Sequence, residues 1–194
     1  MGRQEQTNHL FSNRDLRILL VPLIVEQILN SLMGTADSIM VSNVGAAAIS
    51  AVSLVDSINI LVIQAFYALA AGGTIVCSQY IGQKDKKNAE ESARQLSFVV
   101  ACISSAVMAV CLLTRGPLLR LIFGSVEADV MEAAQIYFFY TALSFPFIAL
   151  YDAGSSIYRA QGNTRLPMTI AVVSNGLNIA GNAVLIWGFH LGVA

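Results

Sequence analysis

Four acidic residues interrupt otherwise apolar stretches of this sequence: Glu26, Asp37, Asp56 and Asp152. An ionisable group in such a stretch costs several kcal/mol unless it has a partner, an aqueous cavity or a function. Burial favours the protonated carboxyl, whereas bound Na⁺ or an organic cation favours the charged form. A buried carboxylate can therefore exchange one cation for another, and joined to alternating access this is the chemistry of ion-coupled antiport.

Polar residues in the first apolar segment follow the helical repeat. Spacing of i, i+4, i+7 and i+11 keeps a set of residues within about a 60° arc of one helix face. The set consists of Glu26, Asn30, Met33 and Asp37, and Gln27 begins a second row on the adjoining face. A polar stripe of this kind cannot face lipid, so we expect it to line an interior or a cavity.

The last apolar segment carries a row of amides on one face. Asn175, Asn178 and Asn182 are spaced i, i+3 and i+7. By depth, Asn178 and Asn182 fall in the same half of the bilayer as Asp37, so the three side chains are expected to meet. The alternative is that these amides only hold helices together by hydrogen bonds, which contribute about 0.6 kcal/mol each on average.

Two further segments carry shorter polar rows. Asp56 and Asn59 lie near mid-depth, and Tyr137 and Tyr140 share a face suited to lining a cavity for an amphipathic organic molecule. The alternative for the tyrosines is a place at the membrane interface. For the substrate cavity we predict Glu26, Gln27, Asn30, Asp56, Asn59, Tyr137, Tyr140 and Asn175. Asp152 precedes Arg159 by seven residues, which predicts a structural ion pair.

Composition defines the class of protein that carries these residues. Of 194 residues, 56% are hydrophobic and 12% charged, and the net charge is -1. Because a soluble domain carries about 25% charged residues, these values exclude an ordinary soluble enzyme and a disordered segment. The charge balance also excludes a nucleic-acid partner. The three cysteines and two histidines show no ligand spacing, so we expect no cofactor, and the sequence predicts an all-α polytopic membrane protein in contact with the lipid bilayer.

Apolar stretches with few charges divide the chain into five predicted spans. Residues 1–15 form a polar tail, and the spans are about 16–40, 46–81, 95–114, 133–151 and 167–187 of a first transmembrane bundle at 16–194. The second stretch, at roughly 36 residues, exceeds the ~30 Å bilayer core. We expect it to tilt, to break near Gly72 and Gly73, or to project into water.

The distribution of Lys and Arg predicts the orientation in the plasma (bacterial inner) membrane. With the N-terminus in the cytoplasm, only Arg115 and Arg120 fall outside. The nine cytoplasmic residues are Arg3, Arg14, Arg17, Lys84, Lys86, Lys87, Arg94, Arg159 and Arg165. The sequence stops in the middle of the apolar pattern, so we expect truncation before or at a sixth helix of the bundle.

Several stretches together resemble the N-terminal half of the multidrug and toxic compound extrusion (MATE) transporters, and the resemblance covers almost the whole chain. They are Pro22, ADSIMVSNVG followed by AAAISAVS, AAGGTIVCSQYIGQKD with NAEESARQ, YRAQGNTRLPM and SNGLNIAGNAVLIWGFHLGVA. The resemblance implies five helices of a six-helix bundle, one half of a two-bundle transporter whose C-terminal bundle is missing here. It also implies export of small organic cations or drugs in exchange for Na⁺ or H⁺.

The resemblance assigns the coupling site to Asp37, Asn178 and Asn182, with a Na⁺ site at Asp37 and Asn178. Asn182 stands where the family pattern NxxxD has its aspartate, which leaves Asp37 as the main titrating group. Two alternatives remain: a lipid-linked precursor flippase of the same superfamily, and a membrane module that does not transport. No enzyme is expected, because the catalytic motifs HExxH and GxSxG do not occur in the sequence.

Overall fold

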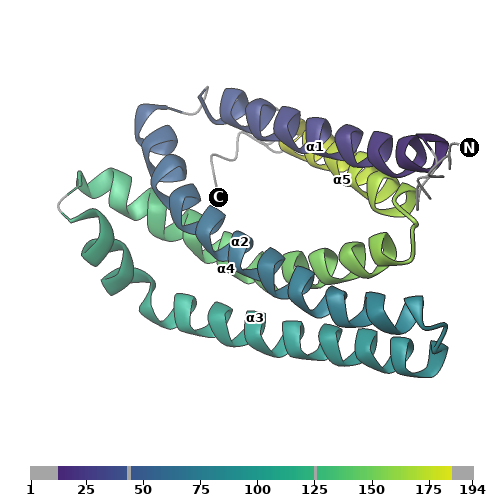
Figure 1. Cartoon of the computed structure of the whole chain (residues 1–194). Coiled ribbons are helices and arrows are strands. Elements are labelled where there is room, and N and C mark those ends of the chain that lie inside the picture. The colour runs from purple at the N-terminus through teal and green to yellow at the C-terminus, as the bar shows by residue number, and fades with distance from the viewer. Residues whose placement is uncertain (1–12, 43–44, 125, 185–194) are drawn as a thin grey trace, which may run out of the picture.

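The described part of the chain forms five α-helices (Figure 1). The computed structural model describes residues 13–42, 45–124 and 126–184. The helices are α1 (Asn13–Ser42), α2 (Ala46–Gly82), α3 (Lys86–Phe123), α4 (Ala128–Ala160) and α5 (Arg165–Ala183). The all-α class predicted from composition is confirmed, and no strand occurs in the described ranges.

Four of the helices are long and apolar enough to cross a membrane, over Leu16–Thr35, Ala46–Gly82, Lys86–Phe123 and Ala128–Ala160. Many of their large apolar side chains point outward: Leu113 is 84% exposed, Phe147 76% and Leu61 74%. A soluble protein does not present so much aliphatic surface to water. These side chains are suited to contact with lipid. The fifth predicted span extends to residue 187, beyond the described residues.

The helices α1 to α4 are longer than the spans predicted for them. α2 continues through Gly72 and Gly73 without a break over 37 residues, or about 55 Å. α3 begins nine residues before its apolar stretch, because Asp85 caps it by accepting a hydrogen bond from the Asn88 amide at 3.2 Å. These polar turns extend the helix beyond the apolar segment that hydropathy detects.

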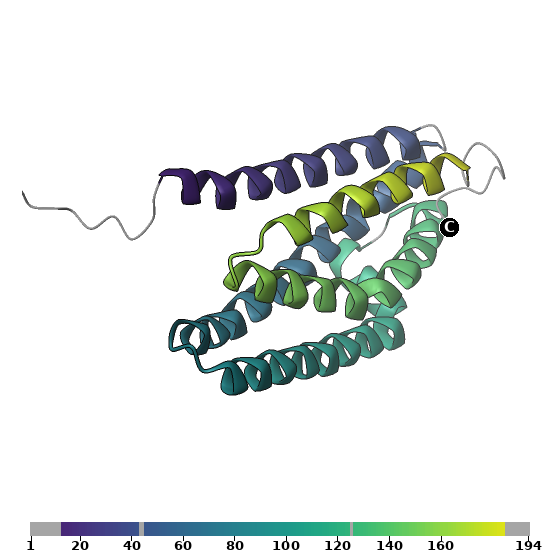
Figure 2. The same cartoon turned by 90° about the vertical axis from the view of Figure 1, so that its right-hand side faces the viewer.

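Two groups of helices make up the arrangement. α2, α3 and α4 pack against one another, and α1 packs mainly along α5 (Figures 1 and 2). The core between α2, α3 and α4 contains small residues, among them Ala51, Ala70, Ala142 and Ala149, all fully buried. Small residues let apolar helices approach closely where no hydrophobic driving force exists.

Aromatic and glycine contacts complete this core. The rings of Phe66 on α2 and Phe145 on α4 meet edge to face at 5.9 Å. Gly73 on α2 faces α3 so closely that a Cβ there would collide with the side chain of Leu96. The Gly72–Gly73 pair therefore serves close packing, with Gly73 at the contact.

Candidate functional site

A cavity of about 400 Å³ opens between α1, α2 and α4, and we call it the polar cavity. Its lining residues are Leu23, Glu26, Gln27 and Asn30 of α1, Gln64 and Tyr67 of α2, and Tyr151, Asp152 and Arg159 of α4. Apart from Leu23, every one of these side chains carries a polar atom. The stripe predicted on the first segment thus contributes Glu26 and Asn30 to this cavity, and the adjoining row contributes Gln27.

An ion pair joins α1 to α4 across the polar cavity. Arg159 Nη2 donates to Glu26 Oε1 at 2.6 Å, with side-chain exposures of 25% and 7%. Breaking such a buried pair is costly, because the remaining charge then lacks compensation. The pair therefore fixes α1, which otherwise packs on α5, to the group of α2, α3 and α4.

The predicted pairing of Arg159 with Asp152 is wrong, since among the described residues Arg159 forms its ion pair with Glu26. Seven residues separate Asp152 from Arg159, or roughly 10.5 Å along the helix axis. Glu26 reaches the guanidinium from the neighbouring helix without that separation. Asp152 still lines the same cavity.

Three atoms in the polar cavity keep unused hydrogen-bonding capacity. Glu26 Oε2, Asp152 Oδ2 and Arg159 Nε are buried and have no hydrogen-bond partner among the described residues. With all groups ionised, two carboxylates face one guanidinium, so the cavity carries a net charge of -1. Buried polar atoms are normally satisfied, and exceptions call for an explanation.

A second polar cluster lies between α2 and α4, further from the α2–α3 turn. Tyr137 Oη donates to Asp56 Oδ1 at 3.2 Å, and Asn59 Nδ2 donates to the same oxygen at 3.4 Å. Asn59 is buried, at 7% exposure. Tyr140 is 56% exposed on α4 and lies outside this cluster. The structure therefore brings Asp56, Asn59 and Tyr137 together and leaves Tyr140 apart.

The packing of α1 along α5 bears on the remaining predicted residues. The two helices run in parallel, and Thr164 Oγ1 donates to Ile18 O at 3.3 Å across 146 residues of sequence (Figures 1 and 2). Both helices rise about 1.5 Å per residue from this contact. Asn182 lies 18 positions after Thr164, so its backbone is level with residue 36, which lies 18 positions after Ile18 and next to Asp37. The side chains of Asp37 and Asn182 lie outside the described residues. On α5, Asn175 is buried and Asn178 half-buried.

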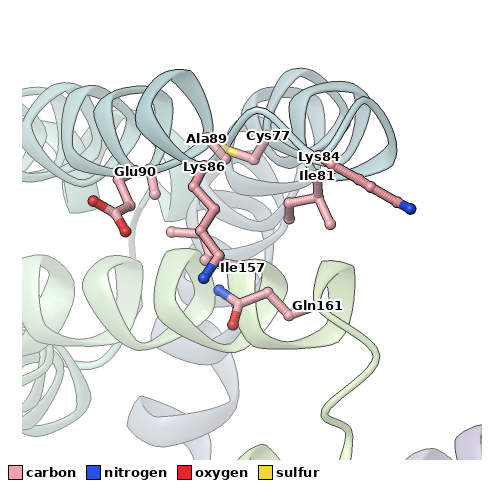
Figure 3. Close-up of a pocket in the computed structure, with 9 residues that line it drawn as sticks. Cys77, Ile81, Lys84, Lys86, Ala89, Glu90, Ile157 and Gln161 are labelled. Carbon is pink, nitrogen blue, oxygen red and sulfur yellow. The ribbon is translucent and has the colours of Figure 1, made fainter.

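A larger and more apolar pocket of about 520 Å³ lies at the end of the bundle that holds the α2–α3 turn (Figure 3). Its walls include Cys77, Ile81 and Ile157, and its polar residues are Lys84, Lys86, Glu90 and Gln161. Figure 3 shows Lys86 and Gln161 pointing toward one another and Lys84 pointing away. None of the sequence-predicted site residues lines this pocket, so the polar cavity is the better candidate for the site.

The predicted substrate cavity lacked five polar residues of the polar cavity. Gln64 and Tyr67 are spaced i, i+3 on α2, Tyr151 ends the predicted span 133–151, and Asp152 and Arg159 lie beyond that span on α4. The i, i+3 spacing was a usable signal for the first two. For Tyr151 and Arg159, helical periodicity gives the face but not the helix that this face contacts.

Among the described residues, no group of three His, Cys, Asp or Glu side chains could hold a metal ion. Long apolar helices around a polar, partly charged interior define a multi-spanning membrane protein of the transporter kind. Comparison with known sequences is more specific, since residues 22–184 match the model of the MatE family. The chain belongs to the MATE family of transporters.

The relatives of known sequence are longer than this chain. It is 34% identical to the "Uncharacterized transporter YisQ" of Bacillus subtilis (strain 168), covering 98% of this chain and 41% of that protein. It is 27% identical to the "Multidrug resistance protein PmpM" of Pseudomonas aeruginosa, covering 93% of this chain and 37% of that protein. The chain thus spans about two fifths of the length of the curated relatives it matches.

Solved structures confirm the fold. A MATE crystal structure in complex with MaD3S aligns with a TM-score of 0.87 at 23% identity, over 93% of this chain and 40% of that one. An outward-facing MATE family transporter of the MOP superfamily aligns with a TM-score of 0.86 at 23% identity, over 93% and 40%. The five helices are therefore arranged as in part of a MATE transporter, as the resemblance implied.

Proposed function

We propose that this chain forms most of the first bundle of a transporter that exports small organic cations across the plasma membrane in exchange for Na⁺ or H⁺. The N-terminus lies in the cytoplasm, and a second bundle completes the transporter. The family membership supports transport and drug export. The substrate charge, the coupling ion and the orientation are the proposed parts.

The observation that carries the proposal is the net charge of the polar cavity. Glu26 and Asp152 outnumber Arg159, and Tyr67 and Tyr151 contribute aromatic walls to the same space. An organic cation gains from a nearby carboxylate and from the face of an aromatic ring. The same charge repels the phosphate of a lipid-linked precursor, which argues against the flippase alternative.

We assign coupling to Asp37 with Asn178 and Asn182. The parallel packing of α1 and α5 supports this assignment, because it brings the backbone of Asn182 to the level of Asp37. Protonation or Na⁺ binding at Asp37 neutralises its carboxylate and thereby changes which cation the bundle holds. Exchange of the two cations then follows from alternating access between two bundles.

Efflux of ethidium from cells that express the complete natural chain tests the proposal. Na⁺ and pH gradients are imposed separately on cells carrying the wild type, Asp37→Asn or Asp129→Asn. The last variant is the matched control, because Asp129 is exposed in the first turn of α4. We expect gradient-driven efflux that only Asp37→Asn abolishes, and the effective gradient identifies the ion. Efflux that survives Asp37→Asn would place coupling elsewhere.

A further inference from the structure

We propose that the polar cavity binds one monovalent cation, Na⁺ or a proton, at the unpaired carboxylate oxygens of Glu26 and Asp152. This site is separate from the coupling site assigned to Asp37 and lies about 16 Å from it along α1, since Asp37 is eleven positions after Glu26 in the helix. The inference deepens the proposed export function and rests on it in one respect, because the small cation and the organic cation compete for the same negative charge of the polar cavity. It rests on the geometry between α1, α2 and α4.

Burial of an unpaired acceptor is the first observation. Glu26 is 5% exposed, and its Oε2 atom has no hydrogen-bond partner in the part of the chain that the structure describes. Asp152 Oδ2, which lines the same cavity, is likewise buried without a partner. An ionised carboxylate oxygen taken out of water without a donor is expensive. A cation between the two oxygens removes that cost for both.

The charge balance of the cavity is the second observation. Its titratable side chains are Glu26 from α1, Tyr67 from α2, and Tyr151, Asp152 and Arg159 from α4. With Glu26, Asp152 and Arg159 ionised, the charges of the cavity sum to -1. Neither α3 nor α5 contributes a described residue to the lining. One positive charge therefore makes the cavity neutral.

The donor set favours a monovalent ion. Asn30 and Gln64 line the cavity with the two carboxylates and offer amide oxygens, the ligand type that hard cations such as Na⁺ prefer. A divalent ion would sit beside the Arg159 guanidinium with only two carboxylates to balance both charges.

The site also has a structural consequence. Arg159 pairs with Glu26 through Oε1, so a cation at Oε2 leaves the ion pair intact. It adds a second link between α1 and α4, at a place where the two groups of helices otherwise have few contacts. A bound cation therefore strengthens the contact between the α1–α5 pair and the group of α2, α3 and α4.

The test uses the complete natural chain, purified and reconstituted in nanodiscs of neutral lipid, without drug or gradient. Bound ²²Na⁺ per chain is counted at equilibrium, and the infrared carbonyl band of protonated carboxylic acids is followed through a pH titration. The variant is Asp152→Asn, because it brings the cavity to neutrality without removing either partner of the Glu26 ion pair. Asp129→Asn is the matched exposed control, and Asp152→Glu restores the charge.

We expect Asp152→Asn to lose one cation per chain, while Asp129→Asn and Asp152→Glu retain it. Loss of one bound Na⁺ identifies the ion as Na⁺. Loss of a carboxylic-acid band that is present at neutral pH, where an ordinary exposed aspartate is ionised, identifies a proton. If the folded Asp152→Asn protein keeps both the Na⁺ stoichiometry and every carboxylic-acid band that the wild type shows at neutral pH, the proposal is overturned. Failure of ethidium efflux leaves this binding result standing, so the two proposals fail separately.

Discussion

Replacing each partner of the Glu26–Arg159 pair with glutamine should destabilise the bundle unequally. Glu26→Gln leaves Arg159 beside Asp152 in the polar cavity, a sum of zero. Arg159→Gln leaves Glu26 and Asp152 together, a sum of -2. Because two like charges in one cavity repel each other, the arginine variant should be the less stable of the two.

The burial of the Glu26–Arg159 ion pair determines how much stability each variant loses. Removal of one partner from a buried pair costs about 3–5 kcal/mol, and the side chains here are only 7% and 25% exposed, with a 2.6 Å contact. We place Glu26→Gln near the lower end, because Asp152 remains as a counter-charge for Arg159, and Arg159→Gln near the upper end. The difference of about 2 kcal/mol corresponds to roughly a 30-fold change in the unfolding equilibrium constant.

The assay is detergent-induced unfolding of the complete natural chain at fixed pH and Na⁺, with both single variants and the double variant. The double variant should lose less stability than the sum of the two single variants, since it leaves neither charge without its partner. Glu91→Gln is the control: Glu91 pairs with Arg94 on the exposed start of α3, at exposures of 45% and 79%, and no measurable loss is expected. Equal losses below about 1 kcal/mol for both single variants would show that the pair behaves like a surface salt bridge, and would refute this reasoning.

Two further predictions concern packing and hydrogen bonding between helices. Gly73→Leu should destabilise the fold by about 1–3 kcal/mol through overpacking between α2 and α3. Gly72→Leu should not, because no atoms lie near the Cβ position of Gly72. Thermal unfolding of both variants tests this, and equal unfolding midpoints would contradict the close contact at Gly73. Tyr137→Phe removes the 3.2 Å hydrogen bond to Asp56 and should cost about 1 kcal/mol in the same assay, with no change if water replaces the hydroxyl.

Hydropathy predicted the helices because a membrane segment must be apolar over a length set by the bilayer. It could not predict their ends. In α3, for example, Glu91 accepts hydrogen bonds from Arg94 and Gln95 at 3.1 Å each, and such local pairs stabilise helical turns that carry no apolar signal. The helix therefore starts well before the apolar stretch.

Helical spacing predicted which face of a helix carries the polar residues, but not which residues of other helices contact that face. Helical spacing predicted that Glu26 and Asn30 share one face of α1, and both line the polar cavity. It could not show that Glu26 would meet Arg159, which lies 133 residues away, or that Tyr137 would reach Asp56 across 81 residues. Such pairs depend on which helices become neighbours, and a single sequence carries no periodic signal for that.

The long separation between Glu26 and Arg159 has a consequence for biogenesis. A ribosome adds about 5–20 residues per second, so the 133 residues between them take roughly 7–27 s to synthesise. The packing of α1 on α5 comes later still, since the Thr164 contact to Ile18 closes a separation of 146 residues. During that interval α1 has neither its counter-charge nor its main neighbour. Until Arg159 is made, α1 carries a carboxyl in an apolar segment without its partner, at a cost of several kcal/mol. Contact with water or with a cellular insertion factor during synthesis lowers that cost.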